Sequence, residues 1–268
     1  MAMISLLLLI QYILEYFQTS NDADRSLMKQ FFYILGLRSF ILFLSLLFPY
    51  KIGMWIALFG ILSTWLLPGL LSDPNRGFVS ADLSPVNFPH LMERLSLLVI
   101  ITFGESLIGI SEHFSPENFS WESIAIFMTL TNLFMVYIVE VDHLLDVKRE
   151  ETGIRAIYSH YPILFGLSLI TISLTFLGNS EIDIFYTTIY FFSGLVLFMI
   201  GLLQHNKVGL MLPTKIISSI LILIAVGFSI SIVNTGLSWE LLTVIITSLT
   251  TLIMVLFVGF NIKKQLVS

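Results

Sequence analysis

The chain has 268 residues, of which 56% are hydrophobic and only 12% are charged, and its mean hydropathy is +0.93. Soluble domains carry about 25% charged residues, so this composition excludes a water-soluble domain. The sequence contains no cysteine, which excludes disulfides, thiolate metal sites and cysteine nucleophiles. Its net charge is −5 and it has no run of Lys and Arg, so no nucleic-acid partner is expected.

Apolar runs of about 20 residues recur along the chain, and each is long enough to cross a hydrocarbon core of ~30 Å. The runs are continuously apolar rather than alternating, which indicates helices and not the strands of a barrel. The sequence therefore predicts an all-α, polytopic transmembrane helix bundle with about nine spans. In chain order, the predicted spans are Met1–Phe17, Leu27–Phe48, Ile52–Leu71, Leu91–Ser111, Trp121–Val141, Ile157–Leu177, Ile182–Leu203, Leu210–Val233 and Leu237–Phe260.

Most of the predicted connections are short, but residues 72–89 form a long polar stretch, SDPNRGFVSADLSPVNFP. Its Pro, Asp, Ser and Asn residues are typical of a surface loop or of a divider between two bundles. We therefore expect three spans in residues 1–71 and a six-span bundle in residues 90–268, with both parts in one integral membrane domain.

The basic residues are distributed unequally between the two sides of the predicted spans. Ten of the thirteen Lys and Arg residues fall on one side, whereas only Lys51 falls on the other. Because basic loops stay in the cytoplasm, the C-terminus is predicted to be cytoplasmic. Nine spans would then place Met1 outside, so we expect an odd number of spans before it. The alternatives are that the native chain begins outside the cytoplasm, or that one span has been miscounted.

The predicted span at 91–111 carries charge inside the hydrocarbon region. Glu105 lies about 18 Å beyond Glu93 along a helix, because each residue rises about 1.5 Å. Thr102, Glu105 and Gly109 share one face of polar and small residues. We expect that face to point into the bundle, where small residues permit close packing and polar residues find partners.

Arg38 is the predicted partner of Glu105. It lies eleven residues after Leu27, the start of its own span, which places it near mid-depth as well. A buried Arg–carboxylate pair satisfies both charges, whereas either charge alone would be costly in lipid. With Thr102 and Ser106, the pair forms a candidate ion, proton or substrate site. A purely structural link between two helices, or no contact at all, are the alternatives.

Charged residues also gather where predicted spans reach the cytoplasmic side. They are His90, Glu93, Arg94, Glu140, Asp142 and His160. We interpret this set as a candidate cytoplasmic gate, and the alternatives are hydrated salt bridges at the interface or the mouth of a proton path. His and carboxylate clusters bind divalent metals, but the spacing here matches no metal-binding motif, so no metal site is predicted.

Apart from Thr102 and Ser106, uncharged polar residues within the spans, such as the Ser and Thr residues of 157–177, 210–233 and 237–260, are predicted to serve packing. Ser and Thr hydroxyls in membrane helices can bond the backbone of their own helix. Asn132 is the exception, because its amide is predicted to bond a neighbouring helix. The sequence has no Ser–His–Asp spacing, phosphate-binding Gly loop or nucleotide motif, so neither enzyme activity nor a cofactor is expected.

The stretch HLMERLSLLVIITFGESLIGI, residues 90–110, closely resembles the signature of the bacterial low temperature requirement A (LtrA) family. The matching residues are His90, Glu93, Arg94, Gly104, Glu105 and Ser106. Residues 136–146 and 160–174 are similar to two later family segments in order and spacing. About three leading family helices, including an acidic first helix, have no counterpart here, and Val139–Asp142 stands where the family has Phe-Asp-Arg. The resemblance implies a membrane protein associated with growth at low temperature.

Two functions are expected from these observations. The first is an ion- or proton-coupled transporter in the bacterial cytoplasmic membrane, with the lipid bilayer and an unknown small ion or solute as partners. Glu105 would carry the coupled ion, and Arg38 would be its counter-charge. The second is a non-transporting membrane scaffold or envelope assembly protein that supports growth at low temperature. A homo-oligomer is compatible with both.

Overall fold

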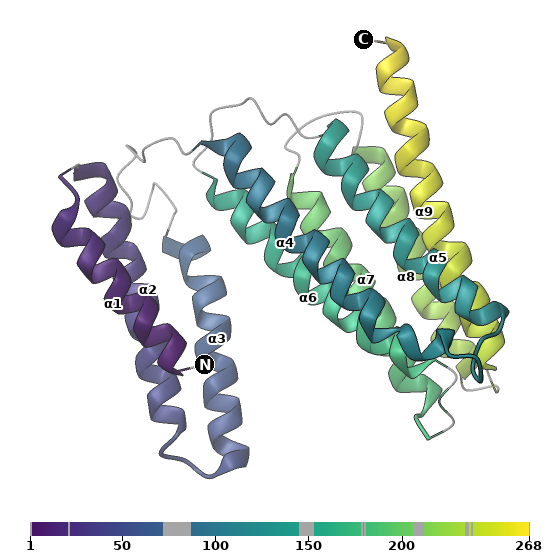
Figure 1. The fold of residues 1–268 in the computed structure, drawn as a ribbon, viewed down its shortest axis with the longest axis horizontal. Helices are drawn as coiled ribbons and strands as arrows, with labels where there is room; N and C mark the ends of the chain where they lie inside the picture. The colour runs from purple at the N-terminus through teal and green to yellow at the C-terminus, as the bar shows by residue number, and fades with distance from the viewer. Residues whose placement is uncertain are drawn as a thin grey trace. The chain divides into compact units, whose positions relative to one another are not determined.

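The computed structural model describes residues 2–20, 22–71, 87–144, 153–177, 179, 181–205, 212–233, 236 and 238–267. These residues form nine α-helices, one 3₁₀ turn and one π-helical segment, and no strand occurs among them (Figure 1). The prediction of an all-α membrane bundle is therefore confirmed. The contacts divide the chain into two compact units, Met1–Pro85 and Val86–Ser268, which are described separately below. Most of the predicted loop at 72–89 lies outside the described residues.

The first unit consists of α1 (Ala2–Gln18), α2 (Asp22–Ser45) and α3 (Tyr50–Leu71), and α2 packs against both of the others. The rings of Tyr12 and Phe31 stack with their centroids 4.9 Å apart, which joins α1 to α2. On the other side, a Cβ at Gly53 would lie 2.5 Å from the carbonyl oxygen of Ser45. Glycine at that position therefore permits the tight connection between α2 and α3.

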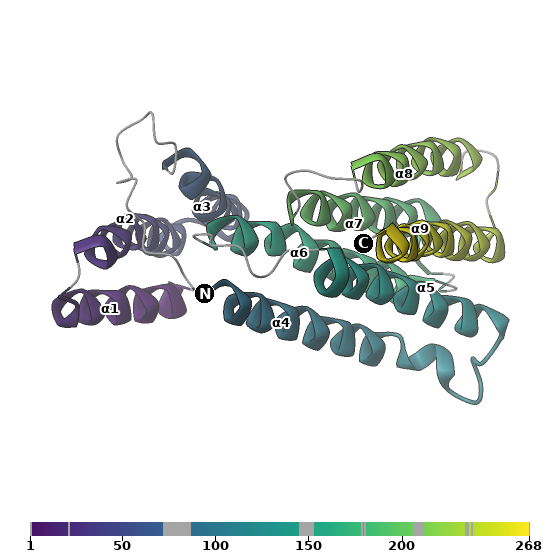
Figure 2. The same cartoon turned by 90° about the horizontal axis from the view of Figure 1, so that it is seen from above.

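The second unit contains six long helices that pack in the order α4, α6, α7, α8, α9, α5, and α5 returns to α4 (Figure 2). Their bounds are α4 Phe88–Gly109, α5 Trp121–Ile138, α6 Ile154–Phe176, α7 Ile184–His205, α8 Leu212–Val233 and α9 Trp239–Val267. The 3₁₀ turn Ser111–Phe114 follows α4, and the π-helical segment Val139–Leu144 continues α5. The fully buried side chains of this unit are mainly Leu, Ile, Val and Phe, so apolar packing forms its core.

The α6·α7 pair is the most extensive helix contact in the second unit, and glycines make it close. A Cβ at Gly166 would lie 2.5 Å from the carbonyl oxygen of Gly194 and 2.7 Å from the backbone nitrogen of Phe198. A Cβ at Gly194 would lie 2.6 Å from the carbonyl oxygen of Gly166. Small residues that let two backbones approach are typical of helix interfaces in membranes.

Among the described residues, four helical stretches are long and apolar enough to cross a membrane. They are Trp121–Val141, Ala156–Phe176, Ile184–Gln204 and Trp239–Gly259. The shorter apolar stretches are Ala2–Gln18, Phe31–Ser45, Tyr50–Thr64 and Ile216–Gly227. The helix α4 is about 33 Å long at 1.5 Å per residue, which suffices for a span, but it carries Glu93, Arg94 and Glu105.

Two helices run more than three residues beyond the predicted spans. The helix α2 begins at Asp22 rather than Leu27, and α9 continues to Val267 rather than ending near Phe260. In both cases the extra residues include charged ones, and a helix can continue into such residues after its apolar part has ended. Apolar length therefore predicts the span and not the whole helix.

Candidate functional site

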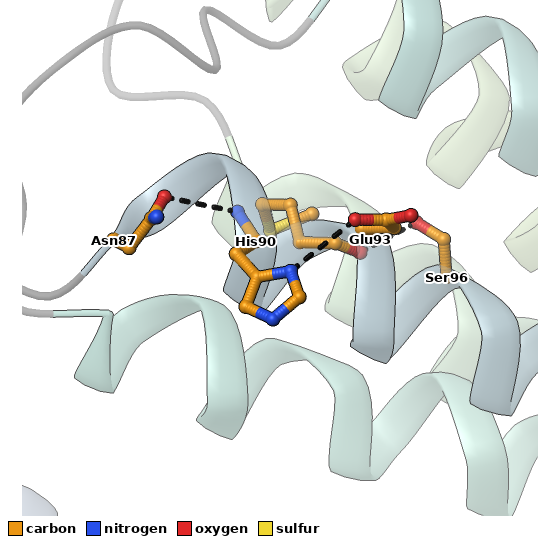
Figure 3. Close-up of polar contacts among 5 residues, drawn as sticks. Asn87, His90, Glu93 and Ser96 are labelled. Atoms are coloured by element: carbon orange, nitrogen blue, oxygen red, sulfur yellow. Dashed lines mark hydrogen bonds and ion pairs between the residues drawn. The ribbon is translucent and has the colours of Figure 1, made fainter.

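The start of α4 is fixed by its cap. The side chain of Asn87 accepts a hydrogen bond from the backbone nitrogen of His90 at 3.3 Å, and Pro89 occupies the first turn, where a missing N–H costs nothing (Figure 3). One turn further, Nδ1 of His90 lies 3.3 Å from a carboxylate oxygen of Glu93 (Figure 3). Of the three predicted gate residues on α4, His90 and Glu93 are therefore in contact, and Arg94 follows Glu93 directly in the chain.

These three gate residues are exposed in the second unit. His90 and Glu93 expose 55% and 69% of their side chains. An exposed pair of this kind contributes little to stability, because water screens it and both side chains lose freedom. The pair therefore marks the polar end of α4 without holding the fold together.

Near the C-terminal end of α4, Ser106 takes the buried position. Its hydroxyl lies 2.6 Å from the hydroxyl of Thr171 on α6, and it also bonds the carbonyl oxygen of Thr102 at 2.9 Å. Glu105 is exposed in this unit. The expectation that Thr102, Glu105 and Gly109 point together into the bundle is wrong for Glu105 within the second unit. Successive helical residues differ by about 100°, and the buried face passes through Ser106 instead.

Arg38 lies in α2 of the first unit and is half-buried. Its Nε atom is buried and has no hydrogen-bond partner among the described residues. Glu105 belongs to the second unit, so the pairing of Arg38 with Glu105 would join the two units and stays a prediction. Burying a guanidinium nitrogen without a hydrogen-bond partner costs free energy, so we expect Arg38 to have an anionic partner.

The structure brings His160 of α6 and Tyr137 of α5 together. Nδ1 of His160 donates to the carbonyl oxygen of Ala156 at 2.7 Å, so Nε2 accepts from the Tyr137 hydroxyl, 3.0 Å away. The hydroxyl of Ser96 on α4 lies 3.4 Å from the same Tyr137 oxygen. Both Tyr137 and His160 are almost completely buried, so three helices meet at one internal polar cluster, Ser96–Tyr137–His160.

Glu140 follows Tyr137 by one turn and is completely buried, with 0% of its surface exposed. It lies in the π-helical segment Val139–Leu144, and segments of this kind occur frequently at functional sites. Asp142 lies in the same segment, but its side chain is outside the described residues. Two of the six predicted gate residues, Glu140 and His160, are therefore inside the bundle, in contrast to the exposed residues of α4.

Sequence reasoning missed Tyr137 and Ser96. Tyr137 has no distinctive pattern among the many aromatic residues, although its spacing of three from Glu140 places the two on one helix face. Ser96 was not singled out from the sequence. Only the arrangement of α4, α5 and α6 shows that both hydroxyls reach His160 or its neighbourhood.

The remaining polar residues behave as predicted. Nδ2 of Asn132 on α5 donates to the hydroxyl of Thr251 on α9 at 2.9 Å, which confirms the predicted bond between helices. Thr171, Thr250 and Thr251 each donate to a carbonyl of their own helix, three or four residues earlier. These hydroxyls are thus satisfied by the backbone of their own helix, whereas the buried hydroxyls of Thr187 and Ser218 have no partner among the described residues.

Long apolar helices packed around an apolar core define a polytopic helical membrane protein. Within that class, residues 1–258 match the model of the family described as bacterial low temperature requirement A protein (LtrA). The chain therefore belongs to the LtrA family. No curated protein and no solved structure matches it.

Proposed function

We propose that this LtrA-family protein is an ion- or proton-coupled transporter of the bacterial cytoplasmic membrane. The observation that carries the proposal is the completely buried carboxylic acid of Glu140, one helical turn from the buried Tyr137–His160 pair. Ionisable residues inside membrane helices are costly to keep, and they commonly belong to ion pathways and proton relays. Glu140 and His160 are both groups that can gain and lose a proton.

In this proposal an apolar layer separates the two polar ends of the interface between α4 and α6. The Ser96–Tyr137–His160 cluster lies near one end, and the Ser106–Thr171 contact lies ten residues further along α4, or about 15 Å. The buried residues between them on α4 include Val99 and Phe103, which are apolar. An apolar layer of this kind prevents leakage, so transport would need a movement of the helices that carries the ion past it.

Glu105 and Arg38 keep their proposed roles as ion carrier and counter-charge. A charged group without a partner costs free energy in lipid, and both residues carry such a group. Glu105 is exposed on α4, and Arg38 has a buried Nε without a partner among the described residues. A contact between them would satisfy both. His90, Glu93 and Arg94 would form the hydrated mouth of the pathway.

A flux assay tests transport. The purified chain is reconstituted into liposomes, and movement of protons, sodium, potassium and chloride is measured against empty liposomes under an imposed gradient. The proposal expects flux of at least one of these ions above the empty control. Absence of any such flux, with protein shown to be folded and inserted, overturns it.

A second candidate function is a non-transporting scaffold or assembly protein. It is favoured by the exposed face of α4, where Arg94 is accompanied by the exposed apolar residues Ile101 and Ile108. A helix face that carries both charged and apolar residues suits a contact with another membrane protein. This function predicts that the double variant Glu105→Gln, Arg38→Gln still supports growth at low temperature. Loss of growth at a normal protein level contradicts it.

We infer that the C-terminus faces the cytoplasm, because the predicted loops on that side hold ten of the thirteen basic residues. The absence of cysteine makes a direct test simple. Single cysteines are introduced at Ser268 and, as a control for the opposite side, at Asn118. A membrane-impermeant maleimide applied to intact cells should label the cysteine at 118 and spare the one at 268. The reverse pattern contradicts the inferred orientation.

A further inference from the structure

The second unit contains a cavity of about 460 Å³ at the end where α4 finishes. Its walls come from the end of α4, the 3₁₀ turn after it, the starts of α5 and α9, and the end of α6, which gather at one end of the unit (Figure 1). A volume of this size falls within the range of about 300–1,000 Å³ that small-molecule sites occupy. The cavity lies at the opposite end of α4 from His90 and Glu93, and Gly109 and Thr175 in its wall follow the Ser106–Thr171 contact by about one helical turn.

Hydrogen bonds between distant segments hold the cavity walls in place. The hydroxyl of Ser123 donates to the carbonyl oxygen of His113 at 2.6 Å, which ties α5 to the 3₁₀ turn. Nε2 of His113 lies 2.9 Å from the carbonyl oxygen of Leu174, which ties the turn to α6. The amide of Asn118 donates to the backbone oxygen of Glu112 at 3.3 Å. The cavity is therefore preformed, and a ligand would not have to order its walls.

The residues that line the cavity favour a positively charged ligand. Three carboxylates line the cavity, Glu112, Glu122 and Glu240, and no Lys or Arg is among the lining residues that the structure describes. Glu122 and Glu240 lie in the first turns of α5 and α9, where the helix dipole favours the charged carboxylate. Trp239 also lines the cavity, and an indole face attracts an ammonium group.

The spacing of these acids argues against a metal ion. In the part of the chain that the structure describes, no three His, Asp or Glu side chains converge closely enough to hold one. Separated carboxylates suit a ligand whose own charges are separated by methylene groups. The apolar residues Ile126 and Leu177 also line the cavity and can contact such methylenes.

We propose that this cavity binds a linear polyamine, a chain of methylenes carrying two or more ammonium groups. The carboxylates of Glu112, Glu122 and Glu240 would each take an ammonium group by a charge-assisted hydrogen bond, and Trp239 would cover one of them. This site does not depend on the proposed transport function. It holds whether or not the protein moves ions.

Isothermal titration calorimetry with spermidine tests the proposal. The full chain is purified in dodecyl maltoside, a neutral detergent, so that anionic lipid does not bind the polyamine. Saturable binding is expected, and the double variant Glu122→Gln, Glu240→Gln should weaken it at least tenfold. Glu112→Gln should weaken it by a smaller factor, because it removes one lining carboxylate and not two, and serves if the double variant unfolds. Glu117→Gln is the matched control, because Glu117 is exposed in the same connection and does not line the cavity.

Three results overturn the proposal. The first is no saturable binding of spermidine by the wild-type chain. The second is equal binding by the wild type and by folded Glu112→Gln and double-variant proteins. The third is displacement of spermidine by an equal concentration of choline, which has one ammonium group, or of Mg²⁺. The proposal expects that either competitor displaces spermidine only at concentrations at least tenfold higher. Displacement at equal concentration means a site for single cations or metals instead.

Discussion

Gly166 offers a sharp test of the helix packing in the second unit. The substitution Gly166→Ala adds a single Cβ at the closest approach of α6 and α7. That atom would lie 2.5 Å from the carbonyl oxygen of Gly194 and 2.7 Å from the backbone nitrogen of Phe198, whereas ordinary contacts begin at 3.4 Å. The two obstacles are backbone atoms, so no side chain can rotate away. The helices must separate by about 0.9 Å, which loosens the packing along the whole pair.

The cost follows from two opposing effects. Overpacking of a close interface costs about 1–3 kcal/mol, and backbone obstacles place Gly166→Ala in the upper half of that range. Alanine in a helix gains about 0.5–1 kcal/mol over glycine. The net loss is about 1–2.5 kcal/mol. For a unit of this size, each kcal/mol lowers the melting temperature by about 2–4 °C, so the expected shift is about 2–10 °C.

The measurement is thermal unfolding of the detergent-solubilised chain by circular dichroism. Gly227→Ala in α8 is the matched control, because a Cβ at Gly227 would meet nothing within 4 Å. It should leave the melting temperature unchanged or raise it slightly, through helix propensity alone. If Gly166→Ala and Gly227→Ala melt at the same temperature as the wild type, the close packing of α6 and α7 is wrong.

Three further substitutions test individual contacts by the same unfolding measurement. Tyr137→Phe keeps the ring but removes its hydrogen bond to His160, and should cost about 1 kcal/mol; no change would mean that the bond is absent. A double-mutant cycle of Asn132→Ala with Thr251→Val should give a coupling energy of about 0.6 kcal/mol, and zero coupling would contradict their contact. Glu93→Gln should change stability by less than about 0.5 kcal/mol, because the His90–Glu93 pair is exposed, and a larger loss would show that the pair is structural.

Much of the fold could be predicted from the sequence, because lipid leaves a chain few choices. The apolar runs predict the helices, since each backbone group in lipid must bond within its own segment. The bond from Asn132 to α9 was predictable for the same reason, because an amide in the middle of a span needs a partner on another helix. The helix ends were not predictable, as α9 shows by continuing beyond its apolar part.

The candidate site was predictable only in part. Glu140 and His160 were found because charged and titratable residues are rare in membrane spans. Tyr137 was missed because one aromatic residue among many has no distinctive pattern. The cavity was also missed, since Glu112, Glu122 and Glu240 belong to three separate segments, and only the packing of the helices brings their ends together. Which side of α4 is buried depends on the neighbouring helices and not on composition, so Glu105 is exposed in the second unit while its neighbour Ser106 is buried.

The most direct test of the central claim is proton movement through the reconstituted chain. A pH-sensitive dye trapped inside liposomes reports proton entry under an imposed pH gradient, for the wild type, Glu140→Gln and the exposed control Glu117→Gln. If Glu140 is part of an ion pathway, the wild type and Glu117→Gln acidify the lumen faster than empty liposomes, and folded Glu140→Gln loses most of that rate. Equal rates in the wild type and Glu140→Gln, or no rate above empty liposomes, contradict the claim.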